Sequence, residues 1–399
     1  MKYVNFLFHI YQPPLQEPSI ITKIVKECYL PLTKAICDFS DLHFTMNINL
    51  SLVEHLHQFA PEVLANIRAA YEQGNLELTS SGAYHPIFPL LPGNEVKRQL
   101  VLNEEGLRRL LTDRFQPKGV FPPEMAFEYQ LAPLFAEQGY RWTITDDMSV
   151  AYQGISIPFD EIYTCEGVSV FLRSNYWSNK FADNRIPGSG KACVDELFHS
   201  LCDWQGKGDG YVIIALDGET FGHHHKQLGE SFLGDLFQAF RDNHQRTKLA
   251  CLSEINDAFP HVSQFIPPGS WSMDKKDVEN RDYFSLWKSP KNKIHTLQWQ
   301  FTDYVLDKVR RFAGKGNEET RKEMDKALFS CQYWWASFWK FNPGEIYKGA
   351  FNMMAILQQV VELQGGDYRQ IRDGESIFRE LVTEVEKERI GRHIEEKRE

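Results

Sequence analysis

The chain has 399 residues, of which 42% are hydrophobic and 25% are charged, a composition typical of soluble globular proteins that excludes disordered and fibrous classes. The formal net charge of −10 disfavours a nucleic-acid partner, and no apolar stretch approaches the roughly 20 residues that a membrane-spanning helix needs. The seven cysteines are scattered and form no CxxC pair, so we expect reduced thiols in a cytoplasmic protein.

Seven short strand-like runs lie in the first 217 residues, and most of them are followed by a segment with helical periodicity. This alternation predicts a parallel α/β sheet or barrel. The runs cover residues 3–8, 43–49, 76–79, 119–121, 141–145, 169–172 and 211–216. Among the intervening helices we expect 61–73, closed by Gly74, then 94–112, opened by an Asn cap, and 191–204.

A polar or charged residue ends or follows each of the seven runs. These residues are His9, Asn49, Ser80, Glu124, Asp146, Arg173 and Asp217. In a parallel barrel the carboxyl ends of the strands share one face, so these side chains are expected to converge there. A single such residue is commonly only a strand cap, but one at every strand end indicates a site.

The sequence pattern changes near residue 262, where a Pro/Gly stretch at 266–271 leads into long segments with helical spacing. We expect helices at 292–312, 317–340, 345–363 and 374–399. We therefore predict a seven-stranded parallel (β/α)7 barrel over residues 1–261. Residues 262–399 are predicted to form a helical bundle domain that completes the active-site cleft.

Two segments place a carboxylate directly after an apolar run. In residues 119–127 the run stops at two prolines before Glu124, because proline cannot continue a strand ladder. In residues 210–217 the apolar run leads straight into Asp217, and glycines after it permit a tight turn beside a ligand. A solvated turn explains Glu124 about equally well when that segment is taken alone. An aspartate after a buried parallel strand, however, is a recurrent catalytic position in barrels.

Two polar clusters accompany these carboxylates, His-Ile-Tyr-Gln-Pro-Pro at residues 9–14 and a second one at residues 74–86. Histidine and glutamine side chains can bind sugar hydroxyls, and tyrosine can stack on a sugar ring. The three consecutive histidines at 223–225 raise the alternative of a metal site. Consecutive side chains in a turn point in different directions, so we expect neither a metal nor a cofactor.

Together these segments resemble glycoside hydrolase family 57, which contains amylases, glucanotransferases and branching enzymes, over most of the chain. The matching motifs are HIYQP at 9–13, LTSSGAYHP at 78–86, FPPEMAF at 121–127, LDGETFGH at 216–223 and FSCQYWWAS at 329–337. The resemblance implies that Glu124 is the nucleophile and that Asp217 is the general acid and base. The substrate-binding residues that we expect are His9, Gln12, Glu77, Tyr84, His85, Arg173, Phe221, His223, Trp271, Trp334 and Trp335.

Two positions depart from the family pattern, and both concern sugar-binding subsites rather than the carboxylates. Tyr11 stands where the first motif usually has a second histidine, and Cys331 stands where the fifth usually has an aspartate.

The resemblance implies a retaining reaction of the α-amylase type, in which α-glucans or malto-oligosaccharides pass through a covalent glycosyl-enzyme. The acid must start protonated, and we expect Phe221 and Trp177 to wall its pocket. The sequence leaves open a 4-α-glucanotransferase with the same residues, and with less weight an α-galactosidase, a metal-dependent polysaccharide deacetylase or an inactive glucan-binding protein. We expect an oligosaccharide or polysaccharide as the partner, with no nucleic acid and no membrane, and the sequence does not predict an oligomeric state.

Overall fold

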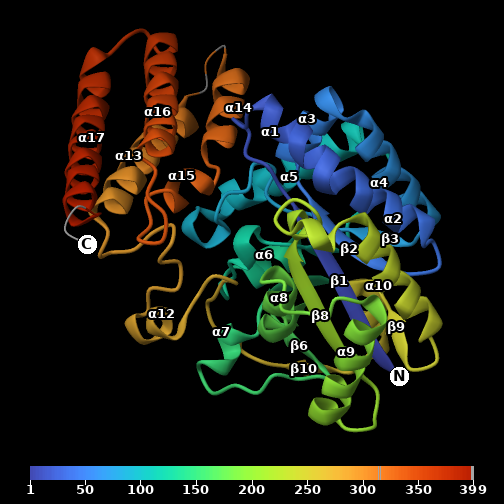
Figure 1. The fold of residues 1–399 in the computed structure, drawn as a ribbon. Helices are drawn as coiled ribbons and strands as arrows, with labels where there is room; N and C mark the ends of the chain where they lie inside the picture. The colour runs from blue at the N-terminus through green and yellow to red at the C-terminus, as the bar shows by residue number, and fades with distance from the viewer. Residues whose placement is uncertain (313, 315, 397–399) are drawn as a thin grey trace. The chain divides into compact units, whose positions relative to one another are not determined.

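A computed structural model describes residues 1–312, 314 and 316–396 (Figure 1). The chain divides into two compact units. The first unit contains Met1–Ala83 and Leu91–Trp271, and the second contains Tyr84–Leu90 and the chain from Ser272 onward. Each unit has its own cluster of buried hydrophobic side chains.

The first unit contains two five-stranded sheets. All pairs in the first sheet are parallel, in the order β3-β2-β1-β8 with β9 beside the start of β1. Its strands are β1 (Lys2–Ile10), β2 (Phe44–Ile48), β3 (Leu76–Leu78), β8 (Gly210–Asp217) and β9 (Thr247–Leu249). The second sheet has the order β10-β6-β7-β5-β4, in which β6 and β7 run antiparallel and the other pairs parallel. Its strands are β4 (Gly119–Val120), β5 (Trp142–Asp146), β6 (Ile162–Cys165), β7 (Val168–Arg173) and β10 (His261–Ser263).

Each of the seven predicted runs contains a strand, but a closed seven-stranded barrel is not confirmed. The two sheets meet at one parallel bridge between Ser80 and Val120, and again where the Ser174 amide donates to the Ile213 carbonyl at 2.8 Å. Strand β4 is short because Pro122 and Pro123 follow it, and proline has no N–H to offer a ladder. Strands β6, β9 and β10 were not predicted, and each has four residues or fewer.

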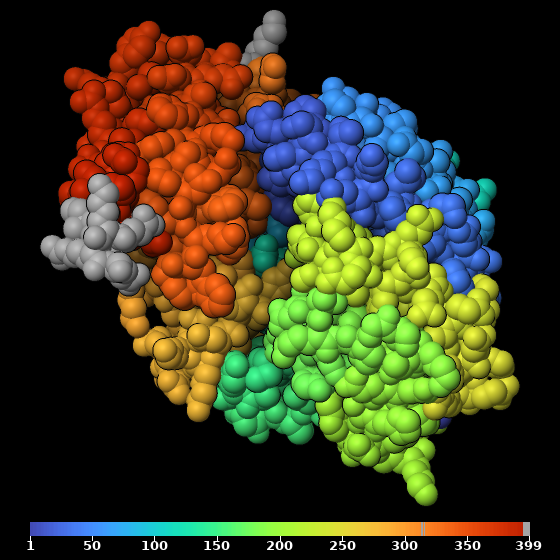
Figure 2. Space-filling view, in the orientation of Figure 1, coloured from blue at the N-terminus to red at the C-terminus, as the bar shows by residue number. Residues whose placement is uncertain are grey.

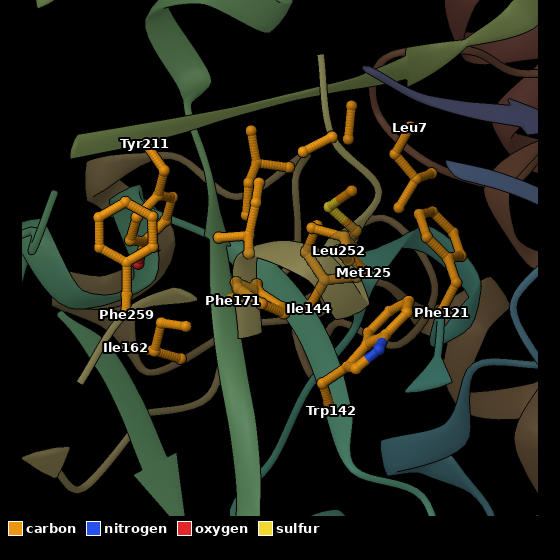
Figure 3. Close-up of a cluster of buried hydrophobic side chains, with 14 residues drawn as sticks. Leu7, Phe121, Met125, Trp142, Ile144, Ile162, Phe171, Tyr211, Leu252 and Phe259 are labelled. Carbon is orange, nitrogen blue, oxygen red and sulfur yellow. The ribbon is translucent and has the colours of Figure 1, made fainter. Parts of the chain in front are cut away.

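One hydrophobic cluster joins side chains from both sheets with helix α11 (Leu252–Ala258) (Figure 3). Its members are Leu7, Phe121, Met125, Trp142, Ile144, Ile162, Phe171, Tyr211, Ile213, Ala215, Ala250, Leu252, Ile255 and Phe259. On β5 and β8, which contribute more than one member, these residues recur at every second position, as side chains on one face of a strand must. The same faces therefore continue toward the carboxyl ends of the strands, beyond the apolar cluster.

The remaining helices of the first unit alternate with its strands. They are α1 (Pro18–Ile24), α2 (Leu30–Asp38), α3 (Leu50–Phe59), α4 (Pro61–Gln73), α5 (Gly93–Leu110), α6 (Leu131–Glu137), α7 (Met148–Ala151), α8 (Asn175–Ala182), α9 (Gly190–Gln205) and α10 (Glu230–Asp242). A π-helix, η1 (Val25–Tyr29), joins α1 to α2, and 3-10 turns η3 (Pro123–Met125), η4 (Gly218–Thr220) and η5 (Lys226–Leu228) lie in loops. Helices α9 and α10 pack side by side and form a continuous green to yellow-green part of the surface in Figure 2.

The ends of two predicted helices test the capping rules. Helix α4 begins with Pro61 and is closed by Gly74 in the left-handed conformation, with φ 89°, as predicted. The predicted Asn cap of the next helix is wrong. Helix α5 begins at Gly93 after Pro92, so Asn94 lies inside its first turn and caps nothing.

The second unit is helical, which confirms the coarse prediction of a mixed α/β region followed by helices. Its helices are η2 (Phe88–Leu90), α12 (Lys275–Asn280), α13 (Lys293–Arg311), α14 (Asn317–Ala327), α15 (Cys331–Trp334), α16 (Pro343–Leu363) and α17 (Tyr368–Glu396). Helices α13, α16 and α17 pack against one another in pairs (Figure 1). The helix predicted at 374–399 corresponds to α17, and residues 397–399 lie outside the described residues.

The single helix predicted over residues 317–340 is wrong, because the chain breaks between α14 and α15. At the break the Ser330 amide donates to the carbonyl of His85 instead of continuing the helix. The Gln332 side chain also donates to the Ala327 and Phe329 carbonyls, which satisfies acceptors at the end of α14. These long-range and side-chain bonds replace the helical ones, and periodicity does not reveal them.

None of the seven cysteines forms a disulfide in the part of the chain that the structure describes. Within the described part of the chain, no helix combines the length and the apolar character that crossing a membrane requires.

Candidate active site

A row of polar side chains crosses the carboxyl ends of adjacent strands in the first sheet. His9 on β1 pairs in register with Asn47 on β2 and with Asp217 on β8. His9 Nδ1 lies 2.7 Å from Asn47 Oδ1, and Asn47 Nδ2 donates to Thr79 Oγ1 at 2.8 Å. Burial lowers the pKa of His9, although the negative charge of Asp217 opposes the effect, so this imidazole is neutral near pH 7.

Strand alternation explains why these residues face the same way. Along four strands the inward-facing position changes from apolar to polar near the carboxyl end, from Leu7 to His9, Ile144 to Asp146, Phe171 to Arg173 and Ala215 to Asp217. Side chains two positions apart share one face of a strand. The hydrophobic cluster of Figure 3 is therefore continued by a layer of charged and polar groups.

Glu124 lies in a tight turn after β4, which we call the Glu124 turn (residues 121–125). Its backbone is left-handed, with φ 60° and ψ 17°, and Met125 follows with φ 50°. Such a conformation is uncommon for residues other than glycine and costs about 1 to 3 kcal/mol, and it occurs most often at functional sites. Trp271 stabilises the turn twice, because its indole Nε1 donates to Glu124 Oε2 at 2.8 Å and its amide donates to the Glu124 carbonyl at 3.3 Å.

The two candidate catalytic carboxylates interact electrostatically. Burial raises the pKa of Glu124 to about 7, the hydrogen bond from Trp271 lowers it, and the charge of Asp217 raises it further. Asp217 also acts on the buried His9, its register partner on β1. Glu124 and Asp217 therefore belong to one electrostatic neighbourhood, and each comes from a strand end, β4 for the first and β8 for the second.

Aromatic rings line this neighbourhood. The His9 ring stacks on Phe121 with a centroid distance of 4.9 Å. The Trp271 ring contacts both of these rings edge-on, with centroid distances of 5.6 Å to His9 and 5.9 Å to Phe121. Tyr11, which replaces the second histidine of the first motif, stacks near His9 at 6.2 Å. Half-buried Trp271 combines an apolar ring face with an N–H that already binds Glu124, an arrangement suited to the flat face of a sugar.

Arg173 is held in a buried ion pair, not left extended toward solvent. Its Nη1 lies 2.6 Å from Asp146 Oδ2, and its Nε donates to the Ala215 carbonyl at 2.7 Å. Its Nη2 donates to Asn179, and its guanidinium carbon lies 5.8 Å from the centre of the Trp271 ring. The structure thus brings Arg173 beside Trp271 as a support for that ring.

The loop after β8, which we call the β8 loop (residues 218–226), contains further predicted residues. Glu219 is buried, and its carboxylate accepts hydrogen bonds from the hydroxyl of Tyr29 and, at 3.3 Å, from Gln12 Nε2. Predicted sugar-binding Gln12 is thereby engaged with Glu219. Predicted His223 lies further along the loop, where its Nδ1 is 2.6 Å from Glu27 Oε2.

Two of the three consecutive histidines bind separate partners. His223 pairs with Glu27, and His225 Nε2 lies 2.7 Å from the Ala182 carbonyl. Among the residues that the structure describes, no group of three or more histidine, cysteine or acidic side chains is arranged to hold a metal ion.

The contacts that the structure gives for three residues expected at the pocket, Glu77, Phe221 and Trp177, are with other residues of the first unit. The Glu77 carboxylate accepts from the amide and hydroxyl of Ser253 at the start of α11, so it caps that helix. Phe221 is fully buried against Phe8, which alternates with His9 and so faces the helix side of β1. Trp177 is also fully buried. Both rings are fully buried, and the expectation that they wall the pocket stays a prediction.

Four predicted sugar-binding residues, Tyr84, His85, Trp334 and Trp335, belong to the second unit. His85 is buried, and its Nδ1 lies 2.9 Å from Ser330 Oγ. Trp334 and Trp335 are half-buried and meet edge-on at 4.8 Å. Their binding of substrate stays a prediction.

Sequence reasoning missed Asn47, Phe121 and Glu219. It expected Asn49 in the polar row, but β2 ends at Ile48 and the Asn49 side chain donates to the Gly82 carbonyl outside the row. The strand register therefore places Asn47, and not Asn49, beside His9 in the polar row. Glu219 stands two residues after Asp217, inside the motif at 216–223. A second carboxylate in a motif already assigned to catalysis could have drawn attention to Glu219.

The family model described as glycosyl hydrolase family 57 matches residues 6–267, which include both carboxylates and the polar row and end four residues before Trp271. The chain belongs to glycosyl hydrolase family 57. The family 57 resemblance predicted from the sequence motifs is thus confirmed.

Curated family 57 relatives match parts of the chain. An α-amylase of Pyrococcus furiosus is 24% identical over 223 residues, which are 55% of this chain and 33% of the relative. A 4-α-glucanotransferase of Thermococcus litoralis is 23% identical over 158 residues, 39% of this chain and 24% of the relative. The matched stretches therefore span a third or less of these relatives' length.

Solved structures share the fold over nearly the whole chain. A family 57 branching enzyme from Pyrococcus horikoshii superposes with a TM-score of 0.74 at 13% identity and covers 96% of this chain and 94% of its own. The α-amylase AmyC from Thermotoga maritima gives a TM-score of 0.67 at 15% identity and covers 96% and 98%. At these identities the likeness establishes a common fold, a mixed α/β region followed by helices.

Proposed function

We propose that the protein is a retaining glycoside hydrolase that cleaves α-glucosidic bonds of α-glucans and malto-oligosaccharides. Glu124 acts as the nucleophile, and Asp217 acts first as acid and then as base. The observation that carries the proposal is the electrostatic coupling of these two carboxylates, one fixed by Trp271 after β4 and the other ending β8. Retaining glycosidases need two such carboxyl groups about 5 to 5.5 Å apart on one pocket.

In the first step Asp217 protonates the glycosidic oxygen while a carboxylate oxygen of Glu124 attacks the anomeric carbon. The bond to the leaving sugar breaks, and the remaining sugar becomes an ester of Glu124. In the second step the Asp217 carboxylate removes a proton from an incoming hydroxyl, whose oxygen displaces Glu124. Two inversions at one carbon give net retention.

The surroundings of Glu124 support this division of work. Trp271 donates to Glu124 Oε2, and the left-handed backbone fixes the direction of the side chain, so the attacking group is oriented before the substrate binds. Neutral His9, held by Asn47, offers a hydrogen-bonding group without adding a positive charge. The rings of Phe121 and Trp271 supply apolar surface for a sugar.

We propose that the seven parallel strands form an interrupted barrel in the order β1-β2-β3-β4-β5-β7-β8. Two contacts support the junctions at which the strand ladders stop. The bridge between Ser80 and Val120 links β3 to β4, and the hydrogen bond from Ser174 to Ile213 links β7 to β8. The seven free thiols support a reducing compartment, and we propose the cytoplasm.

The second candidate is a 4-α-glucanotransferase, because a relative of that name matches the chain and the same two carboxylates serve both reactions. The difference lies in the second step, where a hydrolase admits water and a transferase admits a sugar hydroxyl. Residues 216–223 and 121–127 are compatible with either outcome.

Product analysis tests the proposal. The purified chain and its Glu124→Gln variant are incubated with maltoheptaose and starch, and with a nitrophenyl galactoside panel, and the products are separated by chromatography. We expect only shorter oligosaccharides from the wild type and none from the variant. Longer products in addition would establish the transferase, release from a galactoside would redirect the substrate class, and no product from any substrate would contradict the proposed function.

A further inference from the structure

The Glu124 turn contains two consecutive residues in the left-handed conformation, and neither of them is a glycine. Glu124 has φ 60° and Met125 has φ 50°. Such a backbone is costly for a residue with a Cβ atom, so it persists only where the surrounding structure fixes it. The donors that bind the turn therefore help to set the direction of the Glu124 carboxylate.

Strand β5 lies beside β4, but its ladder stops before the turn. The last pair of the ladder is Val120 with Thr143. Pro122 and Pro123 follow on the β4 side, and proline has no N–H to donate to a neighbouring strand. Side chains of β5 continue the connection where its backbone does not.

Two threonines of β5 donate to carbonyl groups of the neighbouring segment. Thr143 Oγ1 donates to the Val120 carbonyl at 3.0 Å, and Thr145 Oγ1 donates to the Met125 carbonyl at 3.2 Å. The first bond lies within the ladder, whereas the second lies beyond it, on a left-handed residue. Both threonine side chains are fully buried, so a carbonyl that loses its donor here is not readily compensated by water.

The carbonyl groups of both left-handed residues thus accept a hydrogen bond from a distant part of the chain. The Glu124 carbonyl accepts from the Trp271 amide at 3.3 Å, and the Met125 carbonyl accepts from Thr145. Trp271 also binds the Glu124 carboxylate through its indole N–H. A turn that rotates away from its position would therefore weaken the bond to the carboxylate as well.

The segment that contains Trp271 is fixed independently of Thr145. Phe127 and Gly269 form an antiparallel bridge, in which each amide donates to the carbonyl of the other at 2.9 and 3.0 Å. Loss of the Thr145 hydroxyl would therefore leave Trp271 in place and release the turn on the side of β5.

Thr145 faces away from the polar layer of the candidate site. Its neighbours Ile144 and Asp146 are on the two sides of it in the chain, and Ile144 belongs to the hydrophobic cluster that the polar layer continues. Successive side chains of a strand point to opposite faces. Thr145 can therefore influence the chemistry only through the backbone of the Glu124 turn.

We propose that Thr145 is a positioning residue for the nucleophile. By binding the Met125 carbonyl, it keeps the Glu124 carboxylate on Trp271 and in its direction of attack. The inference rests on the proposed function, in which Glu124 attacks the anomeric carbon. A displaced attacking atom slows the reaction without removing the groups that bind the sugar, so the effect falls on kcat and not on KM.

Steady-state kinetics on maltoheptaose tests this role with a matched pair of variants. Thr145→Val and Thr143→Val each remove one buried hydroxyl from the same face of β5 and leave one carbonyl without it, so the two variants lower the thermal unfolding midpoint by similar amounts. Only Thr145→Val lowers kcat, by about tenfold, with KM within about twofold of the wild type. Thr145→Ser keeps a hydroxyl and restores kcat to within about threefold.

A kcat of Thr145→Val equal to that of Thr143→Val overturns the inference, and so does a Thr145→Ser variant that is as slow as Thr145→Val. If Thr145→Val does not fold, the pair Thr145→Ala and Thr143→Ala replaces the valine pair, with the same expected difference in kcat.

NMR of the indole N–H groups tests the position of the turn without any substrate. The Trp271 signal is assigned from its absence in Trp271→Phe. In Thr145→Val we expect this signal to move upfield, the direction of a weaker hydrogen bond, and in Thr143→Val we expect it to coincide with the wild type. An unmoved signal in Thr145→Val overturns the inference and leaves the proposed function intact. A wild type that turns over no glycan, combined with the expected NMR shift, overturns the proposed function, while Thr145 still positions the turn.

Discussion

The Glu124 turn and the β8 loop each follow the carboxyl end of a strand, yet they are stabilised in different ways. The Glu124 turn depends on a left-handed residue at the carboxylate itself and on hydrogen bonds from the indole and the backbone amide of one distant residue, Trp271. The β8 loop leaves Asp217 at the end of a regular strand and is fixed around it by residues of the π-helix η1. Glu124 is thus oriented by its own backbone, and Asp217 by the packing of the loop that follows it.

This difference matches the two tasks proposed for the carboxylates. A nucleophile must attack from one direction, so a strained but fixed backbone is useful at Glu124. An acid that later becomes a base must change its protonation state, so a neighbouring titratable group is useful at Asp217. Glu219 lies on the β8 loop, and nothing comparable follows Glu124 directly in its turn.

Removal of the nucleophile is expected to have the largest effect. Glu124→Gln lowers kcat/KM on maltoheptaose by about four orders of magnitude or more, because no ester can form. The amide keeps the size of the side chain, so the thermal unfolding midpoint changes little. Glu128→Gln, four residues further along the chain, is the control and retains activity. Near-normal turnover of Glu124→Gln would remove it from the nucleophile role.

Removal of the acid is expected to have the second largest effect, and one that depends on the substrate. Asp217→Asn lowers kcat/KM on maltoheptaose by about 10² to 10⁴. A nitrophenyl glycoside loses less in its first step, because nitrophenolate leaves without protonation. Steady-state kinetics on both substrates checks this, and equal losses on the two would argue that Asp217 is not the acid.

Gly222 provides a test of the packing of the β8 loop. It has φ 106°, and a Cβ atom there would overlap the carbonyl oxygen of Glu27 on η1. Gly222→Ala is expected to lower the free energy of unfolding by about 1 to 3 kcal/mol, measured by denaturant titration. Gly234→Ala on α10 is the control, since its Cβ meets no atom within 4 Å and alanine favours a helix. Equal stability of the two variants would show that the loop is not confined by η1.

The smallest effect is expected at Trp271, and it appears as a shift in pH dependence. The indole N–H lowers the pKa of Glu124, so Trp271→Phe raises it and the nucleophile becomes ionised only at higher pH. The acid limb of kcat/KM, near pH 7 in the wild type, moves upward by about half a unit or more. A lower activity with an unmoved acid limb would mean that Trp271 acts on substrate alone.

Local sequence signals predicted much of the fold because they depend on neighbouring residues. Apolar runs located the seven strands, and Pro61 and Gly74 marked both ends of α4. The errors in the predicted fold arose where the structure depends on bonds between residues that are far apart in the sequence. The division of the strands into two sheets depends on single contacts such as Ser80 with Val120, and the break before α15 depends on a bond from Ser330 to His85.

For the site, position in a strand was predictable but side-chain partners were not. Glu124 and Asp217 were singled out by the apolar runs before them and by the family motifs, and their catalytic roles stay predictions. Glu77 lies on β3 between two buried leucines, and only the tertiary contact with Ser253 shows that it caps α11. Phe221 lies inside a motif, and only its packing on Phe8 identifies it as a core residue.

Trapping the covalent intermediate tests the central claim most directly. The Asp217→Asn variant, which forms the ester but resolves it slowly, is treated with a fluorinated α-glucosyl fluoride, digested and analysed by mass spectrometry. Displacement of the anomeric fluoride leaves the fluorinated sugar on the enzyme, so we predict a mass increase of one fluorinated glucosyl unit on the peptide that contains Glu124, and no increase when Glu124→Gln is added. Labelling of a different acidic residue, or turnover that leaves no labelled peptide, would contradict the account.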